Sequence, residues 1–251
     1  MTWTTSSIRP TTERAACQYC HALVDVNHGN LAIAEQLRQP KITPLIPLGT
    51  EGTVRGEPVV CIGFMQRSTW SDGEAFNWRE YLFHAPGGYR WLMEDNGHFM
   101  WIKPVSNADV NVQGLSARFA GRSHRLFSTA HATVEFVIGE FYWRVCVGDT
   151  ADLADFIDPP HIISEERTDN EVNWSGGEYL PGKELWQGLA LPGSPPKPQG
   201  VGMAQPNPVR LGIASGTALA LLVSFCVIGM VFDLSTTGQT VYEGALPMPP
   251  V

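Results

Sequence analysis

The sequence predicts an all-β domain followed by one transmembrane α-helix, and three observations support this prediction. Over residues 45–190, short apolar runs alternate with turn residues at the spacing typical of strands in sheet domains and barrels. The 25 Gly and 19 Pro, together with 8 Trp and 11 Phe, also favour strands and turns over long helices. Residues 211–232, in contrast, contain no charged residue at all.

The β-rich region is expected to consist of antiparallel meanders, as in SH3-like or other small barrels. A tight hairpin is predicted over residues 49–63, and three strands with two turns are predicted over residues 78–103. A second hairpin is predicted over residues 132–147, turning at Gly139 and Glu140. A short helix is expected to start at Thr150 and to continue to residue 156.

Composition divides the chain into five parts. Residues 1–44 form an N-terminal segment with half of a zinc-ribbon-like motif, and residues 45–190 form the β-rich domain. Residues 191–210 hold six prolines and three glycines, a composition that stays extended and acts as a linker. The transmembrane helix is predicted at residues 211–232, and residues 233–251 form a short tail.

The predicted span is long enough to cross a bilayer, because a helix of this length extends about 33 Å. Lys197 and Arg210 precede it, whereas residues 233–251 contain two acidic residues and no basic one. The positive-inside rule therefore predicts a single-pass protein of the inner or plasma membrane with a cytoplasmic N-terminal domain. The 5 scattered cysteines, an odd number, fit that reducing compartment better than a disulfide framework.

The bilayer is thus the first expected partner. A second expected partner is another transmembrane helix, which the small residues of the span suggest. Small residues recur there at every fourth position: Gly212, Gly216, Ala220 and Ser224. Such a stripe lets another helix approach closely, in a homo-oligomer or with a different membrane protein, although small residues are common in membrane helices whatever they contact. Nucleic acid is not expected as a partner, because 25 acidic against 17 basic residues leave a net charge of −8.

Cys17, Cys20 and His21 form a C-x-x-C-H motif with three interpretations. Haem attachment would take place outside the cytoplasm, against the predicted location, and a redox pair would need a preceding strand and a following helix. A structural zinc site needs four ligands, and His21 and His28 are the candidates to complete it. No cofactor is therefore expected, except zinc if the ribbon is completed.

No catalytic motif is recognisable in the sequence, so we do not expect an enzyme of a familiar type. Clusters of acidic and aromatic residues suit recognition of a cation, a peptide or another protein. The candidate ligand-binding or partner-binding residues are Trp78, Glu80, Tyr81, Glu140, Trp143 and Glu178. Strand alternation assigns about half of the aromatic residues near them to the core. The acidic residues of positions 152–171 are expected to form a solvated face.

Several motifs, taken in order, resemble one known family. They are Gly49-Thr50-x-Gly52, Trp78-x-Glu80-Tyr81-Leu82, Trp91-Leu92, the run from Gly139 to Val145 (GEFYWRV), and Asn173-Trp174-x-x-Gly177-Glu178-Tyr179. Over about residues 45–190 the chain is similar to the bacterial domain of unknown function 4178. The resemblance implies no known chemistry. It implies two Cys pairs ahead of the β domain, a Pro-rich linker and a transmembrane helix, and an association with membrane stress or homeostasis systems.

Two functions remain open at this point. The first is a membrane-anchored, non-enzymatic adaptor or sensor domain, and the alternative is a small-ligand module for a cation of the polyamine type, or an unrecognised enzyme. A ligand site requires glutamate and tryptophan side chains to converge in one pocket, whereas an adaptor requires an exposed apolar or charged patch.

Overall fold

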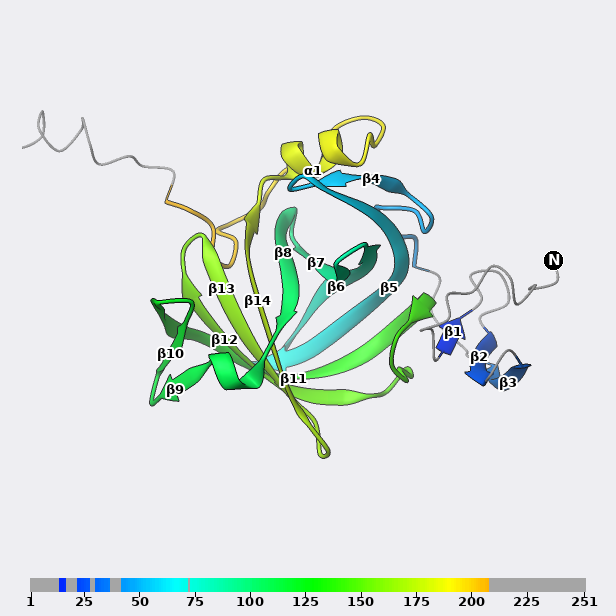
Figure 1. Ribbon diagram of the computed structural model, residues 1–251, viewed down its shortest axis with the longest axis horizontal. Coiled ribbons are helices and arrows are strands. Elements are labelled where there is room, and N and C mark those ends of the chain that lie inside the picture. Colours follow the sequence, from blue (N-terminus) through cyan, green and yellow to red (C-terminus); the bar gives the residue numbers. More distant parts are fainter. Residues whose placement is uncertain (1–13, 17–21, 28–29, 37–41, 72, 208–251) are drawn as a thin grey trace, which may run out of the picture. The chain divides into compact units, whose positions relative to one another are not determined.

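The structure is a computed structural model that describes residues 14–16, 22–27, 30–36, 42–71 and 73–207 (Figure 1). Nearly all of the regular structure in these residues is β-strand, which confirms the all-β class. Among them, no helix is long and apolar enough to cross a bilayer. The predicted span at 211–232 lies outside the described residues, and so do Gly212, Gly216, Ala220 and Ser224.

Eight antiparallel strands close into a barrel. Following the hydrogen-bonded neighbours round the ring, they are β5 (Glu57–Ser71), β6 (Glu74–Ala85), β7 (Gly88–Asp95), β8 (His98–Val105), β14 (Val172–Leu180), β13 (His161–Arg167), β12 (Thr150–Asp158) and β11 (Arg122–Phe141). The ring closes because the second half of β11 pairs with β5, from Val134 opposite Arg67 to Gly139 opposite Gly63. Both closing strands are long, and bulges bend them. The SH3-like comparison therefore understates the number of strands.

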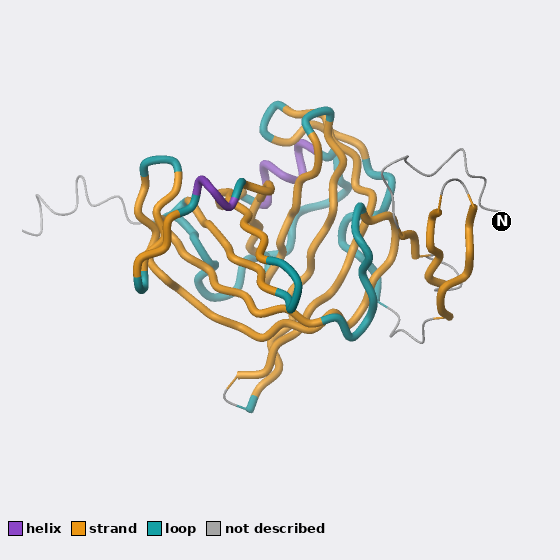
Figure 2. Tube along the Cα trace, turned by 60° about the horizontal axis from the view of Figure 1, so that its bottom comes forward, coloured by secondary structure: helices purple, strands orange, loops and turns teal. Residues whose placement is uncertain are grey.

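Shorter elements are attached to this ring (Figures 1 and 2). β4 (Glu51–Val54) extends the sheet beside β5, and β9 (Asn111–Gln113) and β10 (Ser116–Phe119) form a hairpin on the first residues of β11. β1 (Arg14–Ala16) pairs with the end of β11 and with β2 (Ala22–Asn27), which pairs with β3 (Asn30–Gln36). A 3-10 turn, η2 (Asn107–Asp109), and the helix α1 (Gly182–Gly188) complete the described elements.

The predicted first hairpin and the three-stranded meander are confirmed. β4 and β5 are joined through Arg55 and Gly56, whose φ values of 53° and 78° fit the tight turn that matches strand twist. β6, β7 and β8 follow one another as neighbours, as the turn residues indicated.

Two local predictions were wrong. β11 continues through Gly139 instead of turning there, because its ladder with β5 extends to this residue. Residues 150–156 form a strand instead of a helix, because β12 is paired on both sides, with β11 and with β13. In both places, pairing with neighbouring strands of the sheet overrides the local preference.

Strands β5 to β8 are buried on both faces. On one face, aromatic residues such as Phe64, Tyr81 and Phe99 pack with Leu185 and Trp186 of α1. On the other face, Leu82 packs with Met65 in one cluster, and Met100 packs with Ile102 in another. The helix α1 therefore covers the first face, and the second face belongs to the inside of the barrel, as the ion pairs described below show.

Candidate functional site

A charged cluster lies inside the barrel, where Arg67 of β5 meets Glu166 of β13. The guanidinium donates two parallel hydrogen bonds to the carboxylate, Nη1 to Oε2 at 3.2 Å and Nη2 to Oε1 at 3.1 Å. Going round the ring in the shorter direction, β11 and β12 lie between β5 and β13. This places β5 and β13 about 14 Å apart along the sheet. The two side chains therefore reach each other across the inside of the ring.

Glu80 of β6 is the second acidic partner of Arg67. Its Oε1 lies 3.6 Å from Arg67 Nη1 and accepts a hydrogen bond from Trp78 Nε1 at 2.7 Å. The Arg67 guanidinium lies 6.0 Å from the centroid of the Trp78 ring, at the outer limit of a cation–π contact. Burial raises the pKa of the Glu80 carboxyl, and the charge of Arg67 opposes that rise. Trp78 and Glu80, both predicted as site residues, are thus brought together.

Asp155 of β12 is a third carboxyl group inside the barrel. Its two oxygens accept hydrogen bonds from Ser164 Oγ at 2.6 Å and from Ser128 Oγ at 3.1 Å. Burial raises the pKa of Asp155, and these hydroxyl groups oppose the rise. The prediction that the acidic residues of 152–171 form a solvated face is therefore wrong for Asp155.

The other predicted site residues lie elsewhere. Tyr81 is completely buried on the face that α1 covers, and its hydroxyl accepts a hydrogen bond from the Leu45 amide at 3.0 Å. Glu178 lies at the surface, 3.4 Å from the guanidinium of Arg55. Glu140 is the second-to-last residue of β11, and Trp143 follows the strand in a loop. Glu80, Glu140 and Glu178 thus do not converge in one pocket.

Trp143 instead belongs to a row of half-buried aromatic rings. Tyr89 stacks on Tyr142 at a centroid distance of 4.2 Å, and Trp143 packs against Tyr142 at 4.7 Å and Trp91 at 5.2 Å. The row joins the loop after β11 to strand β7 and packs beside Leu82. Its rings are therefore used for packing at this end of the barrel.

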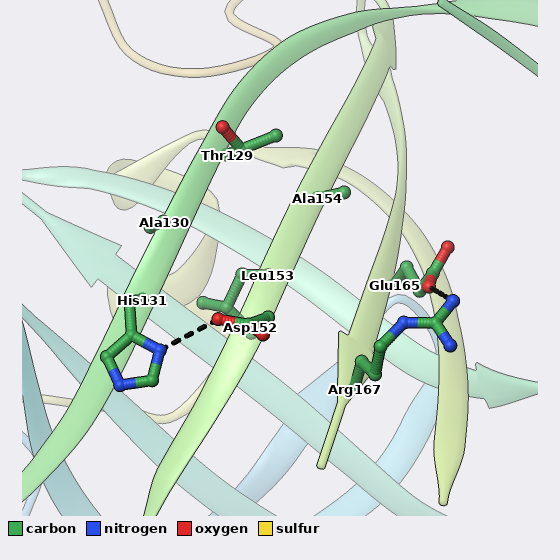
Figure 3. Close-up of a pocket in the computed structure, with 8 residues that line it drawn as sticks. All are labelled: Thr129, Ala130, His131, Asp152, Leu153, Ala154, Glu165 and Arg167. Atoms are coloured by element: carbon green, nitrogen blue, oxygen red, sulfur yellow. Dashed lines mark hydrogen bonds and ion pairs between the residues drawn. The ribbon is translucent and has the colours of Figure 1, made fainter. Parts of the chain in front are cut away.

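A hollow of about 450 Å³ lies on the outer face of β11, β12 and β13 (Figure 3). His131 Nδ1 is 2.7 Å from Asp152 Oδ1, and Arg167 contacts Glu165. Figure 3 shows Thr129 two positions before His131 on β11 and away from its ring, so these side chains do not form a nucleophile–base pair. The charged side chains of this solvent-exposed hollow pair with one another and do not form a catalytic arrangement.

Metal ligation is not supported within the described part of the chain. No group of three or more His, Cys, Asp or Glu side chains there is arranged to hold a metal ion. Cys17 and Cys20, with His21 and His28, lie outside the described residues. The buried thiol of Cys61 is unsuited to ligation or nucleophilic attack, because burial raises its pKa.

Residues 197–205, here called the strap, are fastened to the barrel although the sequence assigned them to a linker. The amide of Gln199 donates to Asn96 O at 2.9 Å. The Gln199 carbonyl lies 3.2 Å from Nε2 of His98, a ring that is 2% exposed. Because a carbonyl only accepts, His98 Nε2 donates to it, and Nδ1 lies 2.9 Å from the Tyr179 hydroxyl.

Close packing completes the attachment of the strap. A Cβ atom at Gly202 would lie 2.4 Å from the His98 ring, so only glycine fits there. Ala204 is 2% exposed and, with Met203, packs against Met100 and Ile162 inside the barrel. The strap is therefore part of the folded domain.

Sequence reasoning missed Arg67, Glu166, Asp155 and His98. Arg67 did carry a signal, because it is a charged residue that follows the apolar run of β5 while still inside the strand. Its partner could not be identified from the sequence, since Glu166 is 99 residues away.

The comparisons with known proteins assign the family. The family model described as a domain of unknown function (DUF4178) matches residues 47–182, more than half of the chain. The matched segment contains all the strands of the closed ring. Comparisons with curated proteins and with solved structures found no match. The chain therefore belongs to the family of the domain of unknown function (DUF4178).

Proposed function

We propose that the barrel is a non-enzymatic sensor or adaptor domain, held close to a membrane by the predicted span at 211–232. The single observation that supports this proposal is the docked strap. A free linker of residues 191–210 would extend about 60 Å at roughly 3.1 Å per residue. With the strap docked, five residues (206–210) separate it from the predicted span, and five residues extend at most about 17 Å.

This arrangement suits a sensor better than a tethered enzyme. A barrel on a long free spacer moves independently of its membrane segment, whereas a docked strap connects the two through a short piece of chain. A ligand or partner that displaces the strap from His98 changes the length of that connection. The strap is then the element with two states that a sensor requires.

The charged cluster favours a second function, the binding of a small cation. Two carboxylates, those of Glu80 and Glu166, pair with the Arg67 guanidinium inside the ring, and its charge also opposes the rise that burial causes in the pKa of the Asp155 carboxyl. Arg67 already occupies the place beside Trp78 and Glu80, however, so an incoming cation has to displace it. We therefore rank cation binding second.

Two measurements on the full chain in native membranes test the first proposal. Membranes washed at alkaline pH should retain the chain, and recovery in the soluble fraction would refute the anchor. Energy transfer from a dye on the barrel to acceptor lipids should be high and should drop in Gly202→Val, because the larger side chain collides with His98. Val201→Ser, at an exposed neighbouring position, is the matched control.

The adaptor aspect has its own test. Affinity purification from membranes at native expression should recover a defined partner in constant proportion. Recovery of the chain alone would leave the sensor interpretation and refute the adaptor interpretation.

A further inference from the structure

Exposed hydrophobic side chains are concentrated on two hairpins. Seven large hydrophobic side chains are exposed in the described part of the chain, and five of them lie at these two places. Trp70 and Phe76, 73% and 50% exposed, lie near the tip of the β5–β6 hairpin. Val112, Leu115 and Phe127, 45%, 73% and 56% exposed, lie on the β9–β10 hairpin and the adjoining part of β11. Large exposed apolar groups of this kind mark interaction sites.

The β5–β6 tip is a projecting ribbon. The ladder between β5 and β11 stops at Arg67, and the ladder between β6 and β7 starts at Arg79. Between these points the two strands pair with each other, down to Ser71 opposite Glu74. Figure 2 shows this ribbon extending from the sheet, with residue 72 in grey. Its apolar side chains are therefore available to another molecule.

The two hairpins carry opposite charge. Residues 68–78 contain Asp72 and Glu74 and no Lys or Arg, whereas residues 111–127 contain Arg118, Arg122 and Arg125 and no acidic residue. Arg122 is paired with Asp158 at 3.2 Å, and the other two arginines are exposed. Leu115 and the bulge at Phe127 lie close together in space, because the Leu126 amide donates a hydrogen bond to Leu115 O at 2.8 Å.

We infer that the β5–β6 tip of one copy of this chain binds the β9–β10 hairpin of a second copy. An acidic aromatic tip and a basic apolar hairpin are complementary in both charge and hydrophobicity. Because the two surfaces differ, the contact runs from the tip of one copy to the hairpin of the next. It either repeats in rings or open chains of copies, or is made twice in a symmetric pair in which each tip binds the other copy's hairpin. This inference uses the barrel alone and does not depend on the membrane anchor.

Photo-crosslinking of the full chain in detergent solution tests the contact directly. Light and isotopically heavy copies are mixed, with benzoylphenylalanine in place of Phe76. We expect crosslinks between light and heavy copies within residues 111–127, and weaker crosslinking at high salt. Crosslinks from tip to tip, crosslinks within one copy only, or none between copies would each overturn the proposal.

A complementation experiment distinguishes a tip-to-hairpin contact from general stickiness. Trp70→Ser damages the tip, and Arg118→Glu with Arg125→Glu damages the basic hairpin. Each variant alone should lose self-association by at least about tenfold, whereas a mixture of the two should form a pair, since one copy keeps an intact tip and the other an intact hairpin. Val201→Ser is the control, because it removes an even more exposed apolar group elsewhere. Failure of the mixture to associate would overturn the tip-to-hairpin contact.

Discussion

Replacement of Arg67 by methionine is the sharpest test of the charged cluster inside the barrel. Methionine keeps an unbranched apolar stem but removes the positive charge beside Glu80, whose side chain is 16% exposed. Glu80 would keep its hydrogen bond from Trp78 and lose its ionic partner. The charge of Arg67 opposes the burial effect on the pKa of Glu80, so the variant should raise that pKa further.

The expected cost follows from the geometry. At the Nη1–Oε1 distance of 3.6 Å, Coulomb's law with an effective dielectric constant of about 20 gives roughly 4–5 kcal/mol. Removing one partner of a buried ion pair typically costs about 3–5 kcal/mol. The Glu166 side chain is 44% exposed, so its pairing with Arg67 contributes only about 0–1 kcal/mol. We expect the free energy of unfolding at neutral pH to fall by about 3–5 kcal/mol.

Urea denaturation followed by tryptophan fluorescence and circular dichroism measures this change. Glu166→Gln is the matched control and should cost no more than about 1 kcal/mol. The double variant Arg67→Met/Glu80→Gln should be more stable than Arg67→Met, because it leaves no unpaired charge. The reasoning is refuted if Arg67→Met stays within about 1 kcal/mol of the wild type, or if the double variant is no more stable than Arg67→Met.

The remaining predictions concern pH, backbone packing and thiol reactivity. Since burial raises the pKa values of Glu80 and Asp155 in the folded state, that state binds more protons at pH values between the ordinary and the raised pKa. The urea midpoint should therefore rise as pH falls through this window, and Glu80→Gln with Asp155→Asn should flatten the profile. Gly139→Ala should destabilise the fold by more than about 2 kcal/mol, because its Cβ would lie 2.3 Å from Ile62 O. Gly148→Ala, at a similar φ but in open space, should cost only about 1–2 kcal/mol by the same denaturation assay; equal costs would contradict the packing argument. Cys61 should resist alkylation until urea unfolds the domain, because it is buried and burial raises its pKa; mass spectrometry that finds it labelled in the native chain would contradict this.

Local signals account for the parts of the fold that were predicted correctly. The meander of β6, β7 and β8 depends on turns such as Asn96-Gly97, whose φ values of 49° and 80° suit Asn and Gly. Trp78 and Glu80 were placed together by strand alternation alone, because residues two apart in a strand share a face. Both conclusions need only neighbouring residues, so they can be drawn without a tertiary structure.

Long-range pairing accounts for the parts that were missed. The ring closes where β11 meets β5, about 70 positions away in the chain, and no local pattern indicates which strand will be the partner. Gly139 looked like a turn residue, but its pairing with Gly63 of β5 keeps it within β11, and glycine is needed there because a Cβ would collide with Ile62 O. The strap looked like a spacer by composition, yet Gly202 and Ala204 pack into the barrel. Proline and glycine exclude a core of their own but do not prevent docking on an existing one.

By itself, the sequence determined the β class, the local hairpins, the resemblance to a family, the uncharged segment at 211–232 and the uneven charge of the chain. These properties depend on composition, period and residues close together in the chain. Only the tertiary structure decided that eight strands close into a ring, that Arg67 pairs with Glu166 across it, and that the strap is docked. Those contacts join residues far apart in the chain, and their free energy depends on burial and geometry that exist only in the folded state.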